Sequence, residues 1–236
     1  DGRDMSLLVV GEPEEGKKKI WITARQHPGE TMAEWLIEGL LDRLLDEDDG
    51  VARALLDKAV FYIVPNMNPD GSVRGHLRTN AAGMNLNREW LNPSLDKSPE
   101  VYLVRQKMLE TGVDLFLDMH GDENLPYNFV AGSEGVPSYN ERIKNLENLF
   151  KQTLLAVTPE FQTEFGYDLD EPGKANMTVA TAWVGEQFNC LAYTVEMPFK
   201  DNANLPDDAY GWSDIRSMKL GQDMLPAILA VADKLR

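Results

Sequence analysis

The sequence has a single cysteine, Cys190, among its 236 residues. Because one cysteine cannot form an intrachain disulfide bond, a reducing compartment, the cytoplasm, is the expected location. No apolar run reaches the roughly 18 residues that a membrane-spanning helix needs, so no membrane association is expected. The sequence begins with Asp1 rather than methionine. We therefore expect a processed chain or a fragment, for which the absence of a signal peptide carries no information.

Positive charge is also scarce. There are 23 lysine and arginine residues against 39 aspartate and glutamate residues, which gives a formal net charge of −16. Nucleic acids and anionic membranes bind clustered Lys and Arg, so neither is expected as a partner. Hydrophobic residues make up 43% of the chain, which predicts a packed core. The length fits one sizeable α/β domain better than two.

The apolar pattern predicts strands that alternate with helices. The expected strands cover residues 6–10, 19–24, 60–64, 115–119, 127–130 and 191–196. The expected helices cover residues 30–45, 51–58, 100–112, 138–156 and 215–235. Ser138 is the expected N-cap of the fourth helix, and Pro226 is expected to bend the last one. This alternation predicts an α/β fold with a largely parallel sheet, in which ligands bind beyond the carboxyl ends of the strands.

Residues 65–99 form a segment of a different kind. The segment is rich in Asn, Gly, Arg and Pro, shows no clear periodicity and is too long for an ordinary connection. Loops of that length in a compact domain usually carry function. Residues 159–174 form a second irregular segment.

Histidine is scarce too, with three residues at positions 27, 76 and 120. His27 and Glu30 stand three positions apart around a Pro-Gly pair, directly after an expected strand. An imidazole and a carboxylate at this spacing can bind one Zn²⁺ if the backbone turns sharply between them. His120, at the end of another expected strand, would be the third ligand. Taken singly, His27 is better interpreted as a surface-loop histidine and His120 as a strand-end cap, but together with Glu30 the metal-site interpretation is the better one.

Two further carboxylates belong to the same pattern. Glu196 ends another expected strand. Beside a metal-activated water it could act as general base and later as proton donor to a leaving amine, whereas the alternative is a strand-terminal surface glutamate. Asp118 lies two residues before His120 and therefore on the same face of its strand. It could orient the imidazole, and a solvated or capping acid is an equally good interpretation.

The irregular segment 65–99 contains Arg78, Asn87 and Arg88. Guanidinium groups and an amide near a zinc ion suit the binding of a carboxylate and the polarisation of a carbonyl oxygen. The alternative is that both arginines are ordinary surface charges paired with the surplus acids.

The order of these motifs resembles that of the zinc carboxypeptidases. Their exact sequences resemble those of the cytosolic carboxypeptidase subfamily and its bacterial relatives. The resemblance extends over residues 1–199 and rests on the following segments: His27-Pro-Gly-Glu30-Thr, Asn68-Pro-Asp-Gly, Arg78, Asn85-Leu-Asn87-Arg88-Glu-Trp, Asp118-Met-His120-Gly and Thr194-Val-Glu196. No single motif is specific, but the ordered set is.

The resemblance implies a role for each of these positions. It implies one zinc ion per chain, held by the metal ligands His27, Glu30 and His120. It implies Glu196 as the catalytic general base and Arg78 as the catalytic residue that polarises the scissile carbonyl. It implies that Asn87, Arg88 and a tyrosine bind the substrate.

The resemblance also implies an architecture. Its mixed, largely parallel sheet of about eight strands would be flanked by helices on both faces. Residues 1–236 would form the catalytic domain, and a β-sandwich domain is expected upstream of it.

Two departures from the family pattern concern the substrate. Family members that remove glutamate carry an arginine shortly before the catalytic glutamate, but this sequence has no arginine between Arg142 and Arg216. Lys174 is the basic residue that could replace it there. The substrate-binding tyrosine of the family lies in the loop before this region, where Tyr167 is the tyrosine that matches.

Three functions remain open at this point. The first is a metallocarboxypeptidase that hydrolyses the last peptide bond of a peptide or protein, whose C-terminus is then the partner. The second is a zinc-dependent deacylase or amidase acting on an acyl-amino acid, which need not use Asn87 and Arg88 to bind a free carboxylate. The third is a catalytically silent binding domain. The sequence does not determine the preferred C-terminal residue or the oligomeric state.

Overall fold

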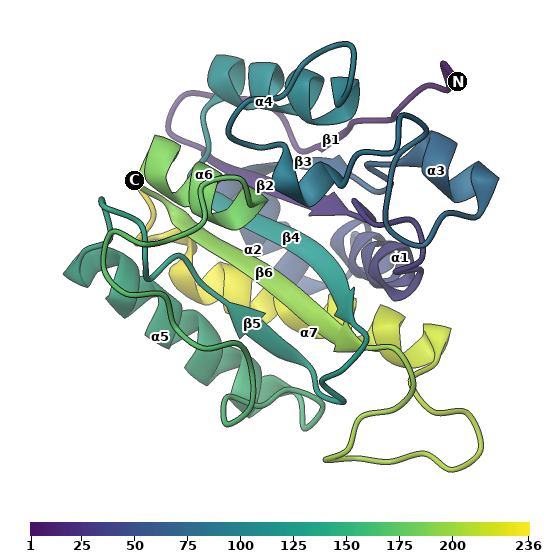
Figure 1. Cartoon of the computed structure of the whole chain (residues 1–236). Helices are drawn as coiled ribbons and strands as arrows, with labels where there is room; N and C mark the ends of the chain where they lie inside the picture. Colours follow the sequence, from purple (N-terminus) through teal and green to yellow (C-terminus); the bar gives the residue numbers. More distant parts are fainter.

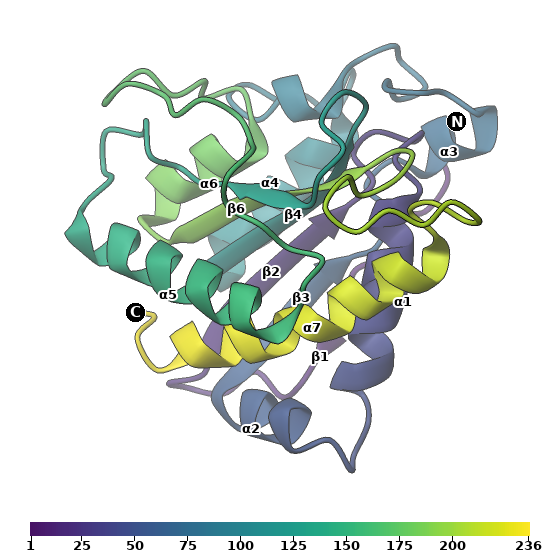
Figure 2. The same ribbon diagram turned by 90° about the horizontal axis from the view of Figure 1, so that it is seen from below.

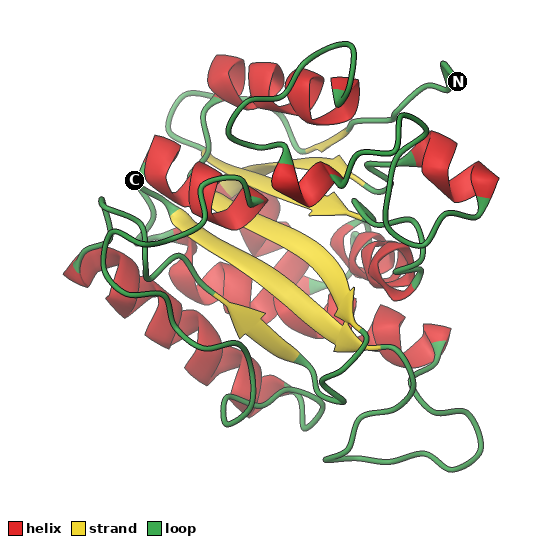
Figure 3. Cartoon of the chain, in the orientation of Figure 1, coloured by secondary structure: helices red, strands yellow, loops and turns green.

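The computed structural model describes all residues, 1–236, and places one β-sheet between two layers of helices (Figure 1). The strands are β1 Leu8–Val10, β2 Lys18–Ala24, β3 Ala59–Val64, β4 Leu115–Asp122, β5 Phe129–Ala131 and β6 Leu191–Pro198. The α-helices are α1 Met32–Leu44, α2 Gly50–Lys58, α3 Pro69–Arg74, α4 Pro99–Thr111, α5 Glu141–Val157, α6 Ala180–Phe188 and α7 Asp214–Ala232, and a 3₁₀ turn η1 covers Leu86–Arg88. Figure 3 shows that long loops join these elements at the sheet edge where the site described below lies.

The sheet has the order β1-β3-β2-β4-β6-β5. Its four inner strands, β3, β2, β4 and β6, are parallel to one another, and the two edge strands pair antiparallel. The expected α/β fold with a mixed, largely parallel sheet and helices on both faces is confirmed. The sheet has six strands rather than about eight. That number came from the family resemblance and not from the apolar pattern, which predicted six strands.

Alternation along the inner strands separates two hydrophobic cores. Ile20 and Ile22 of β2 face a core that α1, α5 and α7 complete, whereas Trp21 between them faces a second core with α4 and α6. Figure 2 shows α5 and α7 lying across one face of the sheet. Both faces of the inner strands are therefore buried, which explains their continuous apolar runs. None of the helices is long and apolar enough to cross a membrane.

The N-cap prediction for α5 is wrong by two residues. The helix begins at Glu141, and the Asn140 side chain accepts hydrogen bonds from the backbone N–H groups of Arg142 and Ile143. The hydroxyl of Ser138 has no hydrogen-bond partner. Asparagine caps a helix at least as well as serine, so Asn140, the residue directly before the helix, forms the cap.

Helix α7 continues through Pro226 to Ala232. A proline inside a helix removes one N–H group and leaves the carbonyl four residues earlier without its helical donor. That carbonyl belongs to Gln222, and it accepts a hydrogen bond of 2.8 Å from Nη1 of Arg43, near the end of α1. The proline therefore lies where the neighbouring helix supplies the missing donor.

The pattern missed two α-helices. Asn68-Pro-Asp-Gly, interpreted as a turn, begins α3, in which the Asn68 side chain accepts from Gly71 N and Pro69 stands at the first helical position. Proline at that position and asparagine before it are both typical helix starts. Helix α6 is missed because its residues 180–185 are all buried, so it lacks the polar face that marks a helix in a sequence.

Candidate metal centre and active site

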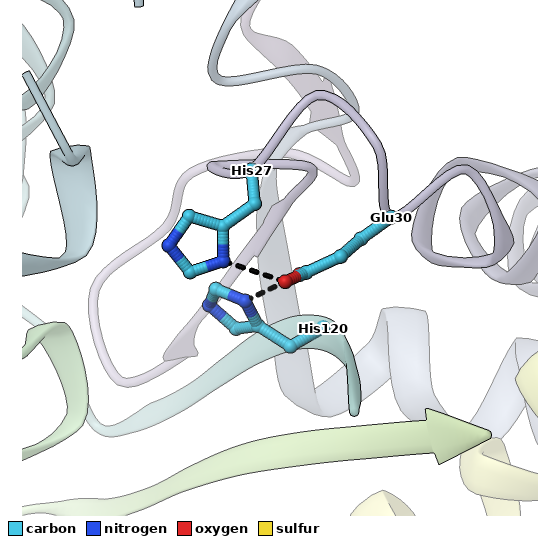
Figure 4. Close-up of side chains that lie close together, drawn as sticks. All are labelled: His27, Glu30 and His120. Carbon is cyan, nitrogen blue, oxygen red and sulfur yellow. Dashed lines mark hydrogen bonds and ion pairs between the residues drawn. The ribbon is translucent and has the colours of Figure 1, made fainter. Parts of the chain in front are cut away.

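His27, Glu30 and His120 meet at the carboxyl ends of β2 and β4 (Figure 4). The Glu30 carboxylate lies between the two imidazoles, with 2.6 Å from Oε1 to His27 Nδ1 and 2.7 Å from Oε2 to His120 Nδ1. All three residues are buried, and one potential ligand atom from each lies within 4.8 Å of the others. In no other group of three or more His, Cys, Asp or Glu residues do the potential ligand atoms come together in this way.

The backbone between β2 and α1 turns sharply to present His27 and Glu30 to the same point. The turn begins at Arg25, which has a φ of 56°, a conformation that non-glycine residues rarely adopt. The Arg25 side chain stabilises the turn, since Nε donates to the carbonyl oxygen of Pro28 at 2.9 Å and Nη1 pairs with Glu34 at 2.5 Å. A strained residue held by its own side chain is typical of a functional site.

The outer nitrogen of each imidazole has its own partner. His120 Nε2 lies 2.8 Å from Asp118 Oδ2, and His27 Nε2 lies 2.9 Å from Asn85 Oδ1. Both partners are oxygen acceptors, so each Nε2 donates a hydrogen bond and each Nδ1 faces Glu30. The two rings are thus oriented for binding a metal ion through Nδ1.

Asp118 is completely buried and is not a solvated acid. Besides the imidazole of His120, it accepts hydrogen bonds from the Thr23 hydroxyl at 2.7 Å and from Gln26 Nε2 at 2.5 Å. Gln26 is in turn bonded to the Trp90 indole N–H at 2.9 Å. These contacts support the interpretation of Asp118 as the residue that orients His120.

The charges of the cluster stabilise one another. Burial would raise the pKa of Glu30, but the charge of His120 and the hydrogen bonds from both imidazoles lower it to about 2. Burial opposes a charge on His120, yet the carboxylates of Asp118 and Glu30 raise its pKa well above the usual value. The positive charge of protonated His120 thus balances the carboxylates of Glu30 and Asp118, as a bound cation would.

Glu196 lies on β6 directly beside His120 of β4, its partner in the strand register. It is 6% exposed, and burial raises its pKa to about 8, with a further contribution from the charge of Glu30. The Tyr167 hydroxyl lies 3.0 Å from Glu196 Oε1 and 2.6 Å from Asp122 Oδ2. A phenol has one proton to donate, so Tyr167 can hydrogen-bond to both carboxyl groups only when one accepts that proton and the other is protonated and donates to the phenol oxygen.

These side chains line one cavity of about 790 Å³. Arg78 and Arg88 reach it from the segment between β3 and α4, and neither arginine forms an ion pair. Burial, together with the charge of Arg78, lowers the pKa of Arg88. Two neighbouring guanidinium groups without counter-ions favour the binding of an anion between them.

All eight residues that the sequence singled out line this cavity: His27, Glu30, Arg78, Asn87, Arg88, His120, Tyr167 and Glu196. Lys174 does not line it, whereas Lys151 of α5 does. The sequence interpretation assigned no role to Gln26, Asn85 or Asp122. Alternation from His120 could have indicated Asp122, but hydrogen bonds between distant loops leave no signal in a single sequence.

The donor set fits a zinc ion. Two imidazole nitrogens and one carboxylate are a known ligand set of catalytic zinc, and they leave a position open for water or substrate. The buried acceptors behind both imidazoles complete the pattern that zinc sites commonly show. Fold and site together define a zinc-dependent class of α/β enzyme.

Comparison with known proteins identifies the family. Residues 1–217 match the zinc carboxypeptidase family, and the chain belongs to that family. The predicted resemblance is thereby confirmed, and with it zinc as the cofactor of the family.

Similar proteins of known structure come from bacteria. A putative carboxypeptidase A from Shewanella denitrificans is 64% identical, with a TM-score of 0.99 over 100% of this chain and 62% of that one. A metallo-carboxypeptidase from Pseudomonas aeruginosa, in complex with (2-guanidinoethylmercapto)succinic acid, is 51% identical, with a TM-score of 0.97 over 100% of this chain and 62% of that one. Mouse cytosolic carboxypeptidase 6 is 32% identical over 84% of this chain and 38% of its own length. The chain therefore spans about three fifths of these bacterial proteins.

Proposed function

We propose that the chain is the catalytic part of a zinc metallocarboxypeptidase that hydrolyses the C-terminal peptide bond of peptides or proteins. One observation carries the proposal: the buried Glu196 and two unpaired arginines line the same cavity as the His27–Glu30–His120 cluster. The single buried Cys190 and the names of the curated relatives support the cytoplasm as its location.

His27, Glu30 and His120 would hold the zinc ion. When bound there, zinc supplies a Lewis acid that polarises the scissile carbonyl and makes a water molecule more acidic. Glu30 stays ionised because its pKa is about 2. The Nδ1 atoms of both imidazoles face the Glu30 carboxylate, and zinc would take the place of the protons that they share with it.

Glu196 moves the protons of the reaction. It accepts a proton from the attacking water, whose oxygen adds to the scissile carbonyl carbon. It then delivers that proton to the nitrogen of the leaving amino acid as the carbon–nitrogen bond breaks. Burial disfavours the charge on the Glu196 carboxylate and raises its pKa, which favours the transfer of a proton to it.

The arginines bind the charges of the substrate. We assign the terminal carboxylate to Arg88 and Asn87, and the developing charge on the carbonyl oxygen to Arg78. Asn87 is held for this task because its Oδ1 accepts a hydrogen bond of 2.8 Å from the backbone N–H of Ala180. Tyr167, already in contact with Glu196, would close over the bound substrate.

This carboxylate site favours a carboxypeptidase over a deacylase or amidase that has no use for a free carboxylate. The ligand of the Pseudomonas relative includes succinic acid, a dicarboxylic acid, which agrees with that preference. Peptides with a free C-terminus should be cleaved, and the same peptides with an amidated C-terminus should resist cleavage. Equal cleavage of both would favour the amidase instead.

Two variants test the mechanism. Glu196→Gln should reduce turnover to background while zinc content stays at one ion per chain, because the ligands are unchanged. His27→Ala should lose both zinc and turnover. Metal analysis and release of the last amino acid measure the two effects separately. Full activity of Glu196→Gln would exclude Glu196 as the base, and a metal-free wild-type protein would favour a silent binding domain.

A further inference from the structure

The cavity extends beyond the catalytic residues along β6 and β5. Thr194 lies two residues before Glu196, so its side chain lies on the same face of the strand, roughly 7 Å along it. Thr194 pairs with Ala131 across the strands, and both line the cavity together with the next residue, Gly132. The Thr194 and Thr181 hydroxyls bond each other at 2.7 Å and offer no charge. This part of the cavity is therefore about as far from Glu196 as a long side chain of the substrate's last residue would reach.

Two carboxylates converge beside Gly132. A Cβ at Gly132 would lie 2.4 Å from Glu147 Oε1 and 2.6 Å from Glu134 Oε2. Glu134 lines the cavity, and Glu147 approaches from α5 through the space that the missing side chain leaves. The glycine thus allows a second carboxylate to come close to the cavity wall.

Glu147 has unused hydrogen-bonding capacity. It is 1% exposed, and its Oε2 accepts a hydrogen bond of 2.7 Å from the Tyr139 hydroxyl. Its Oε1, the atom that faces Glu134 across the space at Gly132, has no partner. A buried carboxylate oxygen without a donor is uncommon in native proteins and calls for a ligand.

The surroundings neutralise this pair only in part. Lys151 stands one turn after Glu147 on α5, lines the cavity and acts by its charge to lower the pKa of Glu147, but it forms no ion pair. The whole cavity is lined by eight acidic residues and three basic ones, and two of those three are the arginines assigned to the substrate carboxylate and carbonyl. The region beside Gly132 therefore favours a cation.

We propose that Glu134 at the cavity wall binds the cationic group of a C-terminal lysine or arginine, and that the unpartnered oxygen of Glu147, which lies behind the wall at Gly132, strengthens this site by its negative charge. The enzyme would then remove basic residues from peptide ends. This inference rests on the proposed carboxypeptidase function, because it assumes that the substrate's last residue occupies the cavity next to Glu196. A C-terminal glutamate could bind only through Lys151, against the repulsion of the surrounding carboxylates.

The test uses three peptides that differ only in the last residue, which is lysine, norleucine or glutamate. Norleucine has the length of lysine without the charge. With the zinc-loaded enzyme, kcat/KM should favour lysine over the other two by about tenfold or more, the effect of one charge-assisted hydrogen bond. Glu134→Gln should bring the lysine-to-norleucine ratio close to one, and Glu147→Gln should lower it. Glu141→Gln, the same change at an exposed position of α5, should leave the ratio as it is.

Binding to the Glu196→Gln variant separates this inference from the proposed function. If no peptide is cleaved by the wild type but the lysine peptide binds about tenfold more tightly than the norleucine peptide, the basic site stands and the carboxypeptidase function fails. If peptides are cleaved with norleucine equal to lysine, the basic site is refuted and the function stands. A preference for glutamate that Lys151→Met abolishes would assign the opposite specificity.

Discussion

Glu147 carries a carboxyl group in surroundings that disfavour its charge. Burial, together with the nearby carboxylate of Glu134, raises its pKa from 4.5 to about 7. The same burial raises the pKa of Tyr193, whose hydroxyl also lacks a hydrogen-bond partner. Residues that bind a ligand are often held at a cost to the stability of the folded chain. Glu147 fits that description, because it lies against the proposed substrate pocket.

The pH dependence of stability tests this cost. Since folding raises the pKa of Glu147, the carboxyl group costs nothing below pH 4.5, and the cost grows as the pH rises to about 7. Above that pH it amounts to about 3 kcal/mol. Glu147→Gln should therefore raise the free energy of unfolding by about that amount at pH 8 and by much less at pH 4.5. Urea unfolding of both proteins at the two pH values measures the difference, and an equal effect at both would contradict it.

The residues that act directly on a metal ion or substrate could be predicted from the sequence. The buried residues that hold them in place by hydrogen bonds could not. The three ligands, Glu196, Arg78, Asn87 and Arg88 were predicted as one site, and all of them line one cavity. The residue pattern indicated the three ligands and the base, whereas only the family resemblance separated the roles of Arg78, Asn87 and Arg88. Gln26 is fully buried and bonded to both Asp118 and Trp90, but these contacts join residues up to 92 positions apart. Partners at such separation follow from the fold and not from local pattern.

Helices α1 and α7 approach each other through glycines. A Cβ at Gly39 of α1 would lie 2.1 Å from the carbonyl oxygen of Met218, and one at Gly221 of α7 would lie 2.1 Å from that of Leu36. Because backbone atoms cannot move aside as a flexible side chain can, any larger residue must push the helices apart. The close contact keeps α7 against α1, whose first turn follows Glu30.

Gly221→Ala should destabilise the protein although alanine favours helices. We expect the free energy of unfolding to fall by about 1–3 kcal/mol through overpacking, which outweighs the gain of roughly 1 kcal/mol in helix propensity. Gly50→Ala is the matched control, since a Cβ at Gly50 of α2 meets no atom closer than 4.0 Å. It should be neutral or slightly stabilising in the same urea titration. A neutral Gly221→Ala would show that the helices shift apart without loss.

Elements with a clear apolar period were predicted within a few residues. The strand expected at 19–24 is β2 Lys18–Ala24, and the helix expected at 30–45 is α1 Met32–Leu44. The helix expected at 100–112 is α4 Pro99–Thr111, which ends one residue earlier, before Gly112. Helix α6 was not predicted because it is buried on all sides and therefore shows no apolar period. Helix α3 was not predicted because its first residues are also typical of a turn.

At the scale of the whole molecule, the metal site joins parts of the chain that are distant in sequence. His27 and Glu30 belong to the turn between β2 and α1, whereas His120 lies on β4, 90 residues after Glu30. Without metal, Glu30 connects the two imidazoles through hydrogen bonds of 2.6 and 2.7 Å. A metal ion would replace these contacts by stronger bonds and would bind the folded state in preference to the unfolded chain, which lacks the preformed site.

Zinc should therefore raise the thermal stability of the entire domain. At a free zinc concentration of 100 times Kd, binding adds about 2.7 kcal/mol to the free energy of unfolding. For a domain of this size, that corresponds to a rise in Tm of roughly 5–10 °C. Thermal melts of the chelated and the zinc-loaded protein measure the shift. Glu196→Gln should show the full rise, because it keeps all three ligands, and His27→Ala should show none. A rise that persists in His27→Ala would place the stabilising zinc elsewhere on this acidic chain and separate the metal's structural effect from the proposed catalytic centre.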